Sequence, residues 1–101
     1  MNKTQINKLI NNYCKANKIS KKKYQLYPLY LHLNGFSHSI GFIDHKAKKN
    51  ETEYNYTSVG YTAYTKECWG YANDHQRRLA TAILSNIPHY TYQRQAQEIL
   101  F

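Results

Sequence analysis

The Asn34-Gly35 pair is the feature that most constrains the fold, because it lies between two apolar runs. Asn-Gly is the preferred pair for the two-residue type I′ turn of a β-hairpin. With these residues as the loop, Leu33 lies opposite Phe36, and side chains alternate between two faces. One face carries Tyr27, Leu29, Leu31, Leu33, Phe36, His38, Ile40 and Phe42, and the other carries Tyr30, His32, Ser37 and Ser39. A slip of one residue would expose the leucines, so the sequence predicts that the first face is buried.

A second strand pattern follows a charged segment, Asp44–Glu53, that has no periodicity and is predicted to be a mobile loop. Residues 54–65 alternate and are rich in Tyr and Thr, as is typical of a strand. We expect Val59, Tyr61 and Ala63 to face the core.

Two segments have helical spacing. Residues 5–18 follow Thr4, a plausible N-cap, and place apolar side chains on one face: Ile6, Leu9, Ile10, Tyr13 and Cys14. Residues 75–86 follow Asn73 or Asp74 as N-cap and end before Pro88. Their predicted buried stripe is Leu79, Ala80, Ile83, Leu84 and Ile87.

The tail, residues 91–101, is predicted to add a short helix through Tyr92, Ala96, Ile99 and Leu100. The whole pattern predicts one α+β domain over residues 1–101. Its order is helix, three-stranded antiparallel meander, helix and short C-terminal helix. Both main helices are expected to cover one face of the sheet, because each has an apolar stripe to bury.

The charge of the chain is uneven. The sequence has 14 Lys+Arg, 6 Asp+Glu and a formal net charge of +8. Residues 1–43 contain seven lysines and no acidic residue: Lys3, Lys8, Lys15, Lys18, Lys21, Lys22 and Lys23. This distribution excludes an acidic mimic of DNA and favours an acidic partner.

Composition also bears on location. No long apolar run or signal-type segment is present, so we expect a cytoplasmic protein, in a host cell if the gene belongs to a phage. Cys14 and Cys68 are then expected to be reduced thiols. Asn, Lys, Tyr and Ile make up 40 of the 101 residues, which suggests an AT-rich genome or a mobile element.

Catalytic and metal-binding patterns are weak. Cys68 and His75 could form a nucleophile–base pair with Asp74 or Asp44 as orienting group, but their context favours packing at a strand–helix junction. The chain lacks the paired spacings of zinc ligands and a Gly-rich phosphate loop. We therefore expect no enzymatic activity, no metal, no cofactor and no small-molecule substrate.

The strongest functional signal is a run of lysines followed by tyrosines. Lysines bind phosphates as sequence-independent point charges, and tyrosines can stack on unpaired bases. Two arginines near a helix start offer a second place for a phosphate. The alternative is a solvated lysine-rich helix end beside tyrosines that simply pack on the sheet. The predicted binding residues are Lys15, Lys18, Lys21, Lys22, Lys23, Tyr24, Tyr30, His32, Arg77 and Arg78.

Two motif resemblances follow. Pro28-Leu29-Tyr30 and the spaced Gly35, His38 and Phe42 resemble the first strands of double-stranded-RNA-binding domains. That resemblance implies a helix, three strands and a helix that bind duplex RNA. The chain departs from the family where its second helix should open with lysines, since Asn73-Asp74 stands there.

The second resemblance covers residues 60–87. Cys68-Trp69-Gly70-Tyr71 and Leu79-Ala80-Thr81-Ala82-Ile83-Leu84 are similar to motifs in small accessory proteins of phages and mobile elements, including proteins of anti-CRISPR type. That resemblance implies a non-enzymatic inhibitor.

Together, these patterns lead to the hypothesis of an inhibitor that docks on a host nuclease effector complex, or on its bound nucleic acid, through the basic, tyrosine-rich surface. A stand-alone RNA- or DNA-binding domain is the second hypothesis, and a small enzyme is the third.

Overall fold

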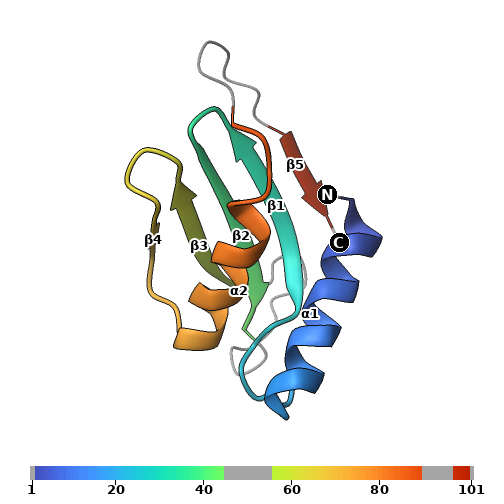
Figure 1. Cartoon of the computed structure of the whole chain (residues 1–101). Coiled ribbons are helices and arrows are strands. Elements are labelled where there is room, and N and C mark those ends of the chain that lie inside the picture. The colour runs from blue at the N-terminus through green and yellow to red at the C-terminus, as the bar shows by residue number, and fades with distance from the viewer. Residues whose placement is uncertain (1, 45–55, 90–96, 101) are drawn as a thin grey trace.

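The computed structural model describes residues 2–44, 56–89 and 97–100 of the chain, the last four by their backbone. Two helices and five strands follow one another as α1 (Lys3–Asn17), β1 (Pro28–Asn34), β2 (Ser37–Ile43), β3 (Tyr56–Thr62), β4 (Glu67–Trp69), α2 (Asp74–Leu84) and β5 (Gln97–Leu100). All strand pairs are antiparallel, in the order β4-β3-β2-β1-β5 (Figure 1). The predicted α+β class is therefore confirmed, with a larger sheet than the expected three strands.

The first hairpin forms with a different turn from the predicted one. Asn34 pairs with Ser37, so Gly35 and Phe36 form the loop in place of Asn34-Gly35. Gly35 has a φ of 50°, which fits a type II′ turn with glycine at its first central position. The register shifts by two residues, an even number, so residues 30–34 and 37–43 keep their predicted faces.

The shift changes which residues meet. Leu31 now lies opposite Ile40, and Leu33 lies opposite His38. Phe36 leaves the buried face for the turn, and an irregularity between Pro28 and Tyr30 ends the alternation at the start of β1. Tyr27, predicted to be buried, is consequently 37% exposed, while Leu26 is fully buried in its place.

The tail differs from the prediction. Residues 97–100 form the edge strand β5 against β1, with Leu31 opposite Ile99, where a short helix was predicted. Residues 91–96 of that predicted helix lie outside the described residues. Of the predicted loop Asp44–Glu53, Asp44 alone is described. The unpredicted strand β4 extends the opposite edge through its pairing with β3.

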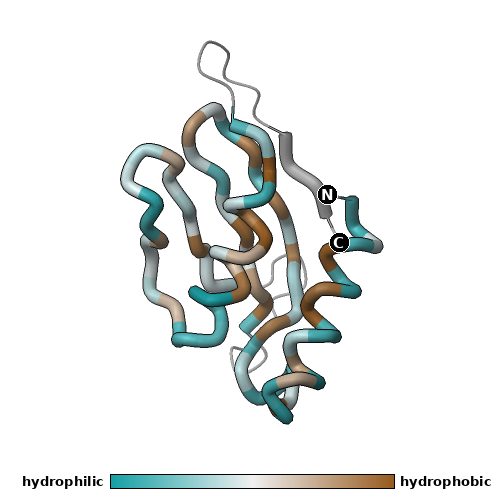
Figure 2. Tube along the Cα trace, in the orientation of Figure 1, coloured by the Kyte–Doolittle hydropathy of each residue, from teal (hydrophilic) through white to brown (hydrophobic). Residues whose placement is uncertain are grey.

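One core joins both helices to one face of the sheet. Ile6, Ile10 and Cys14 of α1 meet the predicted stripe of α2 there, and the sheet contributes Leu31, Ile40, Phe42, Val59 and Tyr61. Ala63, predicted to face the core, is only half-buried beyond the end of β3. The hydrophobic stretches of the helices and central strands coincide with this layer, which confirms the predicted placement of the main helices (Figure 2).

Both helices begin with a reciprocal capping box. In α1 the cap is Asn2, not the predicted Thr4: its side chain accepts the Gln5 amide, and the Gln5 side chain accepts the Asn2 amide. In α2 the same exchange joins Asn73 and Gln76. Within the ranges listed above, neither helix is long and apolar enough to cross a membrane.

Candidate functional site

The lysine run lies where α1 ends and the chain turns back toward the sheet. Lys18 closes the helix in the left-handed conformation, with a φ of 54°, and its amide reaches the Cys14 and Lys15 carbonyls. The next turn folds on itself, since the Leu26 amide donates to the Lys21 carbonyl at 2.9 Å. We call the cations presented by this connection the basic corner: Lys15, Lys18, Lys21, Lys22 and Lys23. All are exposed except Lys21, which is half-buried.

The start of α2 holds this turn in place. The Asn73 side-chain amide donates to the Tyr24 carbonyl at 2.9 Å, and the buried Gln76 amide donates to the Gln25 carbonyl at 2.9 Å. Gln25 itself has a φ of 55°, a conformation that most side chains avoid. The two capping residues of α2 therefore also fix the backbone that carries the lysines, which limits the entropy lost when they bind a partner.

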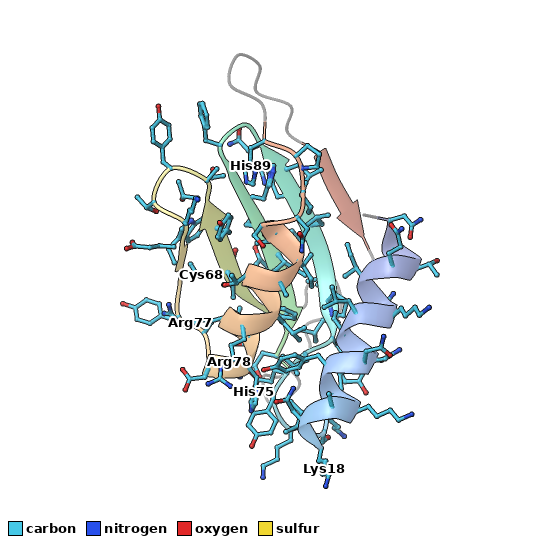
Figure 3. The ribbon with its side chains drawn as sticks, viewed as in Figure 1. Lys18, Cys68, His75, Arg77, Arg78 and His89 are labelled. Carbon is cyan, nitrogen blue, oxygen red and sulfur yellow. The ribbon has the colours of Figure 1, made fainter. Side chains whose placement is uncertain are left out.

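Aromatic rings pack beneath the basic corner. The Tyr13 hydroxyl lies 2.7 Å from His75 Nδ1, and the Tyr24 ring meets the His75 ring edge-on with centroids 4.5 Å apart. Above them, Lys23 Nζ lies 5.7 Å from the Tyr24 ring centroid. His75 and Lys18 lie at the same end of the molecule (Figure 3).

A second lysine–tyrosine pair extends the corner toward the sheet. Lys21 Nζ lies 5.1 Å from the Tyr27 ring centroid, within the range of a cation–π interaction. The charge of Lys21 also affects the buried thiol of Cys14. Burial raises the pKa of the Cys14 thiol, and Lys21 partly opposes that rise.

The structure separates the predicted binding residues into three groups. The five lysines and Tyr24 lie together in the basic corner, whereas Tyr30 and His32 belong to the opposite face of the sheet. Arg77 makes hydrogen bonds within the protein, because its guanidinium donates to the Gly70 carbonyl at 2.7 Å and to the Cys68 carbonyl at 3.5 Å.

The start of α2 is a poor place for a phosphate. The capping box already gives the Asn73 and Gln76 amides hydrogen-bond acceptors, and Asp74 adds a negative charge to the first turn. Arg78 is exposed on α2 near His75 (Figure 3). Arg78 is therefore the arginine that can add to the basic corner, and Arg77 is not.

The suspected Cys68–His75 pair does not form. Cys68 Sγ lies 2.9 Å from Thr81 Oγ1, and His75 is bonded to Tyr13. Among residues 2–44, 56–89 and 97–100, no group of three His, Cys, Asp or Glu side chains could hold a metal ion.

No family model, curated protein or solved structure matches this chain.

The sequence did not single out two exposed aromatic residues on the sheet, Tyr56 and Trp69. Their side chains are 52% and 49% exposed on the face that the helices leave uncovered. The alternation of residues 54–65 placed Tyr56 on this face, but Trp69 required the unpredicted strand β4.

Proposed function

We propose that this protein is a non-enzymatic binding protein that docks on a nucleic-acid-containing complex through the phosphate backbone. The observation that carries the proposal is the basic corner, where five lysines gather on a backbone anchored by Asn73 and Gln76. Lysine ammonium groups bind phosphates without reading sequence, so the proposed contact is strong at low salt and tolerant of sequence.

The neighbouring rings suit the same role. Tyr24 and Tyr27 lie within about 6 Å of lysine ammonium groups, so aromatic rings and positive charge occur together here, as they do in proteins that bind single strands. Recognition of a duplex through the start of α2, as the double-stranded-RNA-binding resemblance implies, is less well supported, because Asp74 stands there and Arg77 is bonded to carbonyls.

A charge-reversal variant tests the proposal. Replacing Lys21, Lys22 and Lys23 with Glu should weaken binding to a fluorescent single-stranded oligonucleotide by at least about tenfold at low salt, because three phosphate contacts become repulsive. Fluorescence anisotropy measures the affinity.

The matched control replaces Lys3, Lys8 and Lys66 with Glu. These lysines are exposed and lie outside the basic corner. The change in net charge is the same in both variants, because each replaces three lysines with Glu. Equal losses in both variants would mean that only total charge matters, and the basic corner would then not be the site.

A second candidate function is inhibition of a host nuclease effector complex, as the resemblance to phage accessory proteins implies. Its support is the AT-rich residue usage of the chain. The chain should then co-purify with the effector and restore phage plaques on a restricting host. Unchanged restriction would contradict this candidate.

A further inference from the structure

The sheet face opposite the helices carries a row of aromatic side chains between small residues, of which Tyr56 and Trp69 are exposed and Tyr30 is half-buried. We call it the open face, and the register assigns to it Tyr30, His32, Ser39, Gly41, Ile43, Tyr56, Ser58, Gly60 and Trp69. The core residues alternate with these along the same strands and point to the helices. A soluble sheet with one uncovered face usually shows polar side chains there, so three large rings require an explanation.

Two of the rings lie over glycines of the neighbouring strand. A Cβ atom added to Gly41 would stand 2.1 Å from Tyr30 Cε1, and one added to Gly60 would stand 1.7 Å from Trp69 Cε2. The glycines thus let the rings lie down on the sheet. Trp69 remains 49% exposed in this position, so part of its indole is available to a flat ligand.

The third ring stands upright beside the first. Tyr56 meets Tyr30 edge-on, with centroids 5.2 Å apart and an interplanar angle of 87°, and the Tyr30 hydroxyl is fixed by a 2.8 Å hydrogen bond to Ser58. Tyr56 remains about half exposed.

The aromatic row is continuous with the basic corner. Ile43 pairs with Tyr56 in the sheet, and the Ile43 amide donates to the Tyr27 carbonyl at 2.9 Å. Tyr27 pairs with Lys21, so the backbone hydrogen bond between Ile43 and Tyr27 places the basic corner beside the Tyr56 end of the open face. Glu67 of β4, which pairs with Thr62, lies at the other end of this face.

We propose that the open face is a stacking surface for the unpaired bases of a single-stranded nucleic acid whose phosphates are held by the basic corner. This inference rests on the proposed function and narrows it to single strands. Positive charge at one end of the row complements the phosphates, and aromatic rings stack on bases without sequence preference. Tyr56 and Gly60 are four residues apart on β3, about 13 Å, so the row is long enough to meet more than one base.

The single tryptophan of the chain provides the test, because Trp69 is itself part of the proposed surface. Titration with rU or dT oligomers of about 12 nucleotides should quench Trp69 fluorescence, since a stacked base contacts the indole. The matching duplex, whose bases are already paired, should produce little quenching even if it binds the lysines.

Leucine variants separate stacking from charge. Tyr56→Leu and Trp69→Leu keep an apolar side chain at each position and should each weaken single-strand binding by roughly tenfold in anisotropy. Tyr71→Leu is the control, because Tyr71 is 99% exposed and follows the open-face strands. Circular dichroism and thermal unfolding confirm that each variant is folded.

The outcomes distinguish this inference from the proposed function. Single-strand binding that leaves Trp69 fluorescence and both leucine variants unchanged would overturn the stacking surface and retain the basic corner. Absence of binding to any of the oligonucleotides at low salt would overturn both. Quenching together with selective loss in the Tyr56 and Trp69 variants would support the stacking surface.

Discussion

At the scale of single residues, the close approach of Trp69 to Gly60 is the contact most sensitive to change. The indole occupies the space that a Cβ atom at Gly60 would need. Gly60→Ala should therefore displace the ring, shift Trp69 emission to longer wavelength and lower the free energy of unfolding by about 1–2 kcal/mol. Fluorescence spectra and urea unfolding measure the two effects. Thr62→Ala, on the same strand and face, should not shift the emission; an unshifted spectrum for Gly60→Ala would contradict the packing described.

His38 couples the fold to pH. Its Nδ1 accepts the Asn34 amide at 3.2 Å and its Nε2 lies 3.1 Å from the Pro88 carbonyl, an arrangement that a neutral ring with a proton on Nε2 satisfies. The ring is 2% exposed and stacks on His89 with centroids 4.1 Å apart. Burial lowers the pKa of His38, and the neighbouring His89 and His32 lower it further, against an opposing effect of backbone hydrogen bonds. Burial also lowers the pKa of His89.

The direction in which stability changes with pH follows from these lowered pKa values. Above the ordinary histidine pKa of about 6.5 both states are neutral and the fold has its full stability. Below it the unfolded chain takes up protons that the folded chain resists, so stability falls, by up to about 1.4 kcal/mol per pH unit for each histidine. Urea unfolding at about pH 7.5 and about pH 5.5 should show this loss. His38→Phe should reduce it, and an equal loss in that variant would assign the effect to other groups.

At the scale of elements, the two capping boxes perform unequal tasks. Asn2 caps α1 at the chain terminus, whereas Asn73 caps α2 and also bonds the Tyr24 carbonyl of the lysine turn. Both Asn→Ala changes remove the same cap, at a cost of about 0.5–2 kcal/mol. Asn73→Ala should cost about 1 kcal/mol more, because it also breaks the bond to the turn. Chemical denaturation compares the two; equal losses would show that the cap does not anchor the basic corner.

The elements also show which parts of the fold can be predicted from the sequence. Apolar spacing was sufficient to predict both helices and the first three strands, because each buries a regular stripe. The exact turn was not predictable, since both Asn34-Gly35 and Gly35-Phe36 can form two-residue loops and only tertiary pairing selects between them. Strand β5 was predicted as a helix because residues 97–100 are too few to distinguish the two periods.

At the scale of the whole molecule, five lysines are gathered in one region outside the hydrophobic core. Its formal charge of +8 comes from an excess in the first 43 residues, and the structure gathers five of those lysines at one end. This grouping was predictable because the lysines are neighbours along the chain. The alternation of the hairpin also placed Tyr30 and His32 on the other face of the sheet. The removal of Arg77 from the binding residues was not predictable, since it depends on carbonyls that only the folded chain brings near.

The salt dependence of single-strand binding tests the central claim most directly. If the basic corner holds phosphates, the logarithm of the binding constant should fall linearly with the logarithm of salt concentration, at about 0.7 per phosphate neutralised. Replacing Lys21, Lys22 and Lys23 with Gln should then reduce the slope by about 2, because three contacts are lost. The same replacements at Lys3, Lys8 and Lys66 should leave it unchanged. A slope that is identical in the wild type and the Lys21, Lys22 and Lys23 variant would contradict the basic corner as the phosphate-binding site.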